Sequence, residues 1–250
     1  MLCLPELPEI RNFRPGELVV NIKAGSRQQI AGFIFILFYL TLLFAAHFIA
    51  AGMIQLPFSW ITLGTFSVIS ILNVFLVEPE LISERLQFGG EGVNRKDQII
   101  ATASAMFVLP IPLIIAGLDL GRFIWTHSFP ITVQIAGVIL YNMGNLFFRW
   151  AMYSNRYFST YVRIQEDRGH EVATGGPYRF VRHPGYAGAI LSAVTLPLAL
   201  GSLYAFLSVF IGCIGLILRT MMEDNQLRRE LAGYPEYASR VRYRLLPGIW

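Results

Sequence analysis

Six long apolar runs constrain the fold of this 250-residue chain more than any other feature. They cover approximately residues 30–53, 56–77, 99–118, 129–152, 184–200 and 203–221. Each run is close to the roughly 20 residues that an α-helix needs to cross a bilayer. A backbone inside hydrocarbon must satisfy its own polar groups, as a helix does. We therefore predict an all-α integral membrane protein with about six transmembrane helices.

The charge content supports this fold class. Charged residues make up 14% of the chain and hydrophobic residues 54%, whereas an average soluble domain is about 25% charged. So few charges do not cover a water-exposed surface of this size. The alternative, a very apolar soluble domain, is disfavoured because it does not explain repeated runs of near-membrane length.

The lysines and arginines indicate the orientation of the chain. If the six runs all cross the membrane, nineteen of the twenty Lys and Arg residues fall on one side, and the loop after the third run holds only Arg122. The positive-inside rule makes the richer side cytoplasmic. We expect both termini in the cytoplasm, and favour a bacterial inner membrane over the endoplasmic reticulum. Because these charges flank membrane spans, the net charge of +4 does not indicate a nucleic-acid partner.

A polar segment, residues 175–188, runs directly into the fifth apolar run. Pro184 is expected to open that helix, because proline is favoured in the first helical turn. Arg182 and His183 precede it, beside backbone amides that attract an anion. They either hold the anionic group of a ligand or extend to lipid headgroups. Gly185 and Gly188 would permit close approach of a helix or ligand.

Arg219 and Glu223 lie four residues apart near the end of the last run, on one helix face. They either form a local ion pair or point separately into a pocket. Arginine before glutamate is the weaker order for such a pair. The residues alone therefore leave the two interpretations equal.

A second polar stripe lies on the fourth run, where Asn142, Asn145 and Arg149 are three and four residues apart. Polar residues on a membrane helix generally face the protein interior. They are candidate substrate-binding residues, although bonding to neighbouring helices is slightly favoured. We predict no metal site, because no cluster has metal-ligand spacing. Cys3 and Cys213 indicate no disulfide framework.

Four motifs together resemble the isoprenylcysteine carboxyl methyltransferase family, whose wider group includes phospholipid N-methyltransferases. The resemblance covers approximately residues 140–250. The motifs are His170–Tyr178, Arg182–Gly188, Glu223–Leu227 and Gly233–Tyr237. The family often has two glutamates where this chain has Glu223 followed by Asp224.

The resemblance implies an integral-membrane enzyme that uses S-adenosyl-L-methionine. Its cofactor pocket is formed by the last helical pair and the cytoplasmic segments that flank it. The implied cofactor contacts are Gln165, His170, Val172, Ala173, Gly176, Tyr178, His183, Tyr186 and Glu223, and the polar segment adds Arg182. Arg219 matches an arginine placed near the substrate carboxylate, so Arg219 and Glu223 are the expected catalytic residues.

We expect methyl transfer to a carboxylate, or to an amine, of a lipophilic or lipidated acceptor that enters from the bilayer. Arg219 would orient an anionic acceptor by bidentate hydrogen bonds. Residues 1–28 are then a cytoplasmic tail, 29–128 carry three spans, and 129–250 form the methyltransferase core. Membrane lipids are the expected surroundings, and the sequence indicates no oligomeric state.

Two alternatives belong to other functional classes. The segment Arg242–Trp250 also resembles the C-terminus of membrane sterol reductases, which use NADPH. The third possibility is a non-catalytic membrane scaffold. The presence of His183, Tyr186 and Glu223 argues against a scaffold, which has no need of them.

Overall fold

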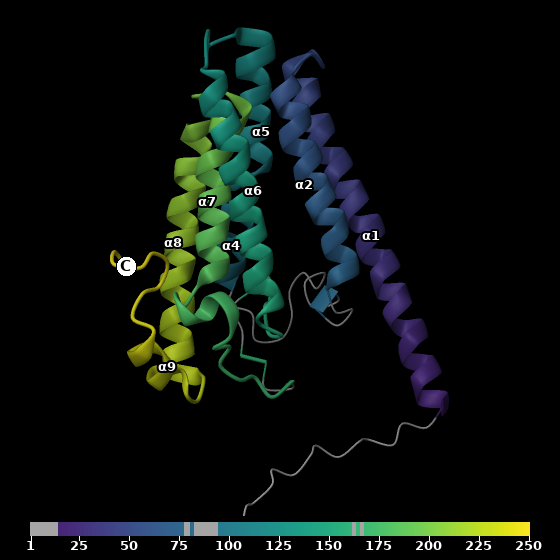
Figure 1. Ribbon diagram of the computed structural model, residues 1–250, viewed down its shortest axis with the longest axis vertical. Coiled ribbons are helices and arrows are strands. Elements are labelled where there is room, and N and C mark those ends of the chain that lie inside the picture. The colour runs from purple at the N-terminus through teal and green to yellow at the C-terminus, as the bar shows by residue number, and fades with distance from the viewer. Residues whose placement is uncertain (1–14, 78–80, 83–94, 162–163, 166–167) are drawn as a thin grey trace, which may run out of the picture.

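The computed structural model describes residues 15–77, 81–82, 95–161, 164–165 and 168–250. These residues form a bundle of long helices with a short helix and the C-terminal segment at one end (Figure 1). The elements are α1 (Pro15–Ala51), α2 (Pro57–Leu76), α4 (Arg95–Val108), α5 (Pro110–Gly117), the π-helix η1 (Leu118–Phe123), α6 (Ile131–Tyr153), the 3-10 helix η3 (Gly176–Arg179), α7 (Pro184–Leu200), α8 (Ala205–Glu230) and α9 (Tyr234–Arg240).

The predicted all-α membrane fold is confirmed. Within the described residues, five helical stretches are long and apolar enough to cross a membrane. The third is Arg95–Phe123, which combines α4, α5 and η1. This stretch is broken where α4 ends at Val108 and α5 begins at Pro110, because Pro110 lacks a backbone N–H. The sixth expected crossing, α7, is apolar but only 17 residues long.

The buried carboxylate of Asp119 links three segments at the end of the bundle away from α9. Asp119 accepts hydrogen bonds from the backbone nitrogen of Thr126 at 2.7 Å and from its hydroxyl at 2.8 Å. The Ser202 hydroxyl donates a third bond at 2.6 Å. These bonds join η1, the loop before α6 and the α7–α8 turn. They fix the relative positions of the helices that carry the site at the opposite end.

Helices α6 and α7 pack with their backbones in contact. A Cβ atom added to Gly188 would lie 2.6 Å from the backbone nitrogen of Phe148 and 2.8 Å from the Gly144 carbonyl oxygen. Only glycine fits there, in agreement with the close approach expected at Gly188. The contact holds the first turns of α7 against the last turns of α6.

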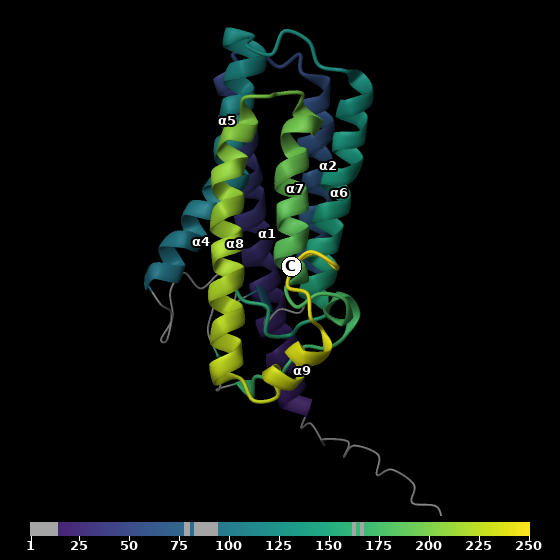
Figure 2. The ribbon, with the colours of Figure 1, turned by 90° about the vertical axis from the view of Figure 1, so that its left-hand side faces the viewer.

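The C-terminal segment returns to the start of α7, with α9 below it (Figure 2). The backbone nitrogens of Arg182 and His183 donate to the carbonyl oxygens of Tyr243 and Arg244, each at 2.9 Å. The chain therefore closes a wall beside the first turn of α7, where Pro184 occupies the predicted first helical position.

Candidate active site

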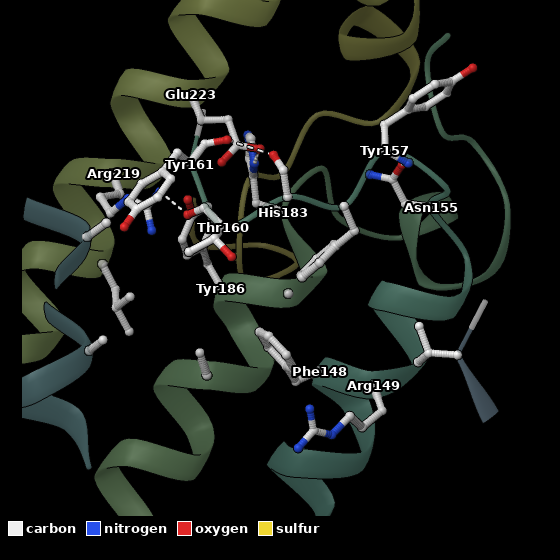
Figure 3. A pocket seen from close by; sticks show the side chains of 18 of the residues that line it. Phe148, Arg149, Asn155, Tyr157, Thr160, Tyr161, His183, Tyr186, Arg219 and Glu223 are labelled. Carbon is white, nitrogen blue, oxygen red and sulfur yellow. Dashed lines mark hydrogen bonds and ion pairs between the residues drawn. The ribbon is translucent and has the colours of Figure 1, made fainter. Parts of the chain in front are cut away.

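A cavity of about 640 Å³ lies between the helices and the segments that connect them. At its polar end it is lined by Tyr157, His170, Tyr178, His183, Tyr186, Glu223 and Tyr234. From there it continues as an apolar arm lined by Phe35, Ile36, Tyr39, Phe66, Val74 and Leu109. Figure 3 shows side chains from several elements converging on this space. A cavity with one polar and one apolar part suits an amphipathic ligand.

Asp224 is the anchor of the polar end. Its carboxylate is fully buried and accepts from Nε of Arg182 at 2.7 Å, of Arg244 at 3.0 Å and of Arg228 at 3.1 Å. The Tyr234 hydroxyl donates to it at 2.9 Å. Because a buried charge is tolerated only when it is paired and hydrogen-bonded, these contacts hold α8, α9 and the C-terminal segment together.

Arg182 lines the cavity but binds protein groups with every nitrogen of its guanidinium. Nε and Nη2 donate to Asp224, and Nη1 donates to the carbonyl oxygens of Val241 at 2.9 Å and Arg242 at 2.7 Å. The side chain therefore fastens the C-terminal segment to α8. The cofactor contact expected for Arg182 stays a prediction, and it would have to compete with these bonds.

Tyrosines form much of the wall around this anchor. Burial raises the pKa of Tyr234, and the nearby negative charge of Asp224 raises it further. Burial also raises the pKa of Tyr178, whose carbonyl oxygen accepts from the Tyr237 hydroxyl at 2.7 Å. These phenols stay protonated at neutral pH. The wall thus offers aromatic faces and hydroxyl donors rather than negative charge.

Glu223 faces the cavity as a carboxylate with little compensation. Its Oε1 lies 4.0 Å from Nδ1 of His183, and its side chain is 29% exposed. The Tyr186 hydroxyl hydrogen-bonds to it. No guanidinium or ammonium group in the described part of the chain pairs with it. Figure 3 shows Glu223 above His183 and Tyr186, so a negative charge lies beside aromatic rings.

Arg219 does not pair with Glu223. Its Nε and Nη2 donate to the two carboxylate oxygens of Asp97, at 2.9 and 3.3 Å, and Nη2 also donates to the Thr160 carbonyl at 3.0 Å. The guanidinium lies over the Tyr186 ring, 5.6 Å from its centre. Of the two interpretations of Arg219 and Glu223, the separate orientation is the one observed. The bidentate bond expected with an acceptor is made with Asp97, which leaves Nη1 available.

The other expected site residues divide into two groups. Those that line the cavity are Asn145, Arg149, His170, Val172, Ala173, Tyr178, His183 and Tyr186. Those that lie outside its lining are Asn142, Gln165 and Gly176. Asn142 donates to the Val138 carbonyl of its own helix at 2.8 Å. Gln165 is fully buried and donates to the Tyr157 carbonyl at 2.8 Å. Both side chains support neighbouring backbone.

Gly176 has a positive φ of 53°, a region that favours glycine, and a Cβ there would collide with the Ser154 hydroxyl. It shapes the turn before η3, which carries Tyr178 into the cavity wall. Among the described residues, no group of three or more His, Cys, Asp and Glu side chains is arranged to hold a metal ion.

Sequence reasoning missed several residues that build the site. Asp97 lies 122 residues before Arg219, and nothing in the local pattern links the two. Asp224 was visible only as a departure from a family motif. The motif Gly233–Tyr237 indicated Tyr234 from the sequence. The hydrogen bond from Tyr234 to Asp224 was not predictable, because it depends on the fold of α9.

Comparison with known proteins agrees with this architecture. Residues 132–232 match the family model described as phospholipid methyltransferase. This segment is similar to that family of membrane methyltransferases. It contains α6, α7 and α8, and therefore Arg149, His183, Tyr186, Arg219 and Glu223. Helices α1, α2 and α4, which supply Asp97 and the apolar arm, lie outside it. No curated protein matches the chain.

We predict that Asp224→Asn destabilises the protein by about 3–5 kcal/mol, because the buried Arg182 and the partly buried Arg244 lose their counter-charge. Unfolding in detergent, followed by circular dichroism, measures the loss. Trypsin should then cleave faster after Arg242 and Arg244. The control is Glu230→Gln on the exposed end of the same helix. Unchanged stability and cleavage of Asp224→Asn would contradict the anchoring role.

Proposed function

We propose that this protein transfers a methyl group from S-adenosyl-L-methionine to a lipophilic acceptor that enters from the bilayer. The observation that carries the proposal is the position of Glu223, a carboxylate beside Tyr186 and His183 at the polar end of the cavity. The phospholipid methyltransferase match over residues 132–232 supports the reaction class.

The polar end fits the proposed cofactor. S-adenosyl-L-methionine, when bound, supplies an activated methyl group on a positively charged sulfur. The faces of Tyr178 and Tyr186 attract such a cation, and Glu223 adds a full negative charge. His170 and Val172 line the adjoining wall, where the nucleoside would lie. His183 is available for the remaining polar groups of the cofactor.

The balance of charges favours an amine acceptor over a carboxylate. The cavity-lining Arg182 and Arg219 are paired with Asp224 and Asp97, whereas Glu223 has no arginine or lysine partner in the described residues. Arg228 and Arg244, which also bind Asp224, lie outside the cavity lining, and the exposed Glu171 adds a second carboxylate to it. A carboxylate acceptor would be repelled there, since like charges interact strongly where water is scarce. An amine would be attracted. Glu223 can also take the proton that an ammonium group must lose before it attacks the methyl group.

Alignment would supply most of the rate acceleration. Holding two reactants in line can lower a barrier by about 7–11 kcal/mol. Asp97 and the Thr160 carbonyl fix the guanidinium of Arg219 beside Tyr186. A guanidinium fixed in this way would hold an oxygen atom of the acceptor through Nη1 and leave the lone pair of the amine free to attack the methyl group.

The apolar arm, lined by residues of α1 and α2 and by Leu109, would provide a path from the lipid phase. We propose the topology expected from the sequence, in which both termini are cytoplasmic, and we favour a bacterial inner membrane over the endoplasmic reticulum. Residues 29–128 then line the route of the acceptor, and 129–250 carry the methyl-transfer chemistry. A sterol-reductase activity would need NADPH, so cofactor binding separates the two enzyme classes and a scaffold.

We predict that isothermal titration of purified protein detects S-adenosyl-L-methionine and S-adenosylhomocysteine but not NADPH. Glu223→Gln should lower the affinity for the charged donor about tenfold, the effect of one lost charged hydrogen bond, and the affinity for the uncharged product less. Glu230→Gln is the matched control. Binding of NADPH alone would replace the proposal with a reductase, and binding of none would leave a scaffold.

We expect radiolabelled methyl donor, incubated with the protein and a lipid extract, to label a lipid. If the acceptor is an amine, the label survives mild alkali, because an N–CH₃ bond is not hydrolysed. A methyl ester would release volatile labelled methanol under the same conditions. Release of methanol would overturn the amine assignment but keep the methyltransferase.

We predict that Arg219→Lys loses most of the turnover while the affinity for S-adenosylhomocysteine stays nearly unchanged. Lysine keeps the charge but cannot bridge both oxygens of Asp97 as the planar guanidinium does. Turnover and binding are measured on the same preparation, with Arg229→Lys as the exposed control. Unchanged turnover would refute the positioning role.

A further inference from the structure

Arg149 is the cavity-lining arginine whose charge has no counter-charge in the described part of the chain. Its Nη2 donates to the Ser70 hydroxyl at 3.2 Å, and the guanidinium lies 5.7 Å from the centre of the Phe148 ring. The Nε atom is buried and has no hydrogen-bond partner. No carboxylate within the described residues forms an ion pair with it.

The contrast with the other cavity arginines is informative. Arg182 and Arg219 each bind the two oxygens of an aspartate. Arginine stays protonated in proteins, and an unpaired charge at membrane depth generally marks a substrate or ion pathway. A guanidinium that faces a cavity with an unsatisfied donor is therefore suited to an anion that arrives with the ligand.

Helix α2 completes the surroundings of Arg149. Ser70 and Asn73 lie three residues apart, on one face of α2, and both line the cavity. The Tyr153 hydroxyl donates to Oδ1 of Asn73 at 2.9 Å. The amide nitrogen of Asn73 therefore remains a potential donor on the cavity wall, one helical turn from Ser70. Val74 begins the apolar lining immediately next to this polar group.

We propose that Arg149, Ser70 and Asn73 form a subsite for the anionic oxygen group of the lipid acceptor, a phosphodiester or a carboxylate. The acceptor's hydrocarbon would lie in the apolar arm along Phe35 and Val74. This inference rests on the proposed function, because it concerns the acceptor of that reaction. It assigns recognition of the acceptor to α2, which lies outside the family-matched segment.

Besides the exposed Glu171, the subsite and Glu223 give the described part of the cavity charges of opposite sign that no charged side chain compensates. Figure 3 shows Glu223 and Arg149 on opposite walls, with Tyr186 and Phe148 between them. A molecule that carries an amine at one end and an acidic group further along would meet both. A neutral amphiphile would leave the guanidinium desolvated and unpaired, which is unfavourable.

The test compares three small amphiphiles with the same chain: octyl phosphate, octanoate and octanol. Each is titrated below its micelle concentration into the full-length protein in a neutral maltoside detergent. We expect octyl phosphate to bind at least tenfold more tightly than octanol. Arg149→Gln should abolish this difference, and Ser70→Ala, which removes one anchor of the guanidinium, should reduce it about threefold. Arg229→Gln is the matched control for net charge.

The outcomes decide both the subsite and its ligand. Equal sensitivity of octanoate to Arg149→Gln would support the subsite and identify a carboxylate as an accepted anion; preference for octyl phosphate would identify a phosphate. Equal binding of octyl phosphate and octanol by the unmodified protein would overturn the inference. So would a difference that persists in Arg149→Gln.

Two further measurements distinguish these outcomes from misfolding of the variant and from failure of the proposed function. Binding of S-adenosylhomocysteine by Arg149→Gln shows that the variant is folded, since Arg149 lies away from the proposed cofactor contacts. If that variant does not fold, the Ser70→Ala titration decides the inference. If the unmodified protein binds octyl phosphate through Arg149 but no methyl donor, the subsite stands and the proposed function fails.

Discussion

The buried carboxylate of Asp224 is the interaction on which the rest of the site depends. It joins the end of α8 to the residues before α7 and to the C-terminal segment, which are distant in sequence. A charge so deeply buried is stable only because several donors converge on it. The polar wall of the cavity, including His183 and Tyr234, takes its shape from that convergence.

The same electrostatic rule distinguishes support from function. Where a cavity-lining arginine is paired with an aspartate, as Arg182 and Arg219 are, its charge is consumed within the protein. Where a charge faces the cavity without such a partner, as at Glu223 and Arg149, the protein leaves an interaction for a ligand to complete. In a low-dielectric pocket these two remaining charges dominate what can enter and in which direction.

Hydrophobicity and proline chemistry predicted most of the fold from sequence. The apolar runs correspond to the helices, and Pro184 marks a helix start where expected. Much of the predicted cofactor region, including His170, Tyr178 and Tyr186, does line one cavity. The ion pairs were not predictable, because Asp97 and Arg219 come together only through the packing of α4 on α8. Gln165 and Gly176 lie within the predicted cofactor region but outside the cavity lining. Gln165 hydrogen-bonds to the backbone, and Gly176 permits a backbone turn.

The bonds between the C-terminal segment and the residues before α7 affect the order in which the chain assembles. Arg182 is bonded to residues that a ribosome adds about 60 positions later. During synthesis, the membrane helices can therefore insert and pack while the cavity still lacks one wall. A nascent chain would complete that wall only after residues 241–244 have been added.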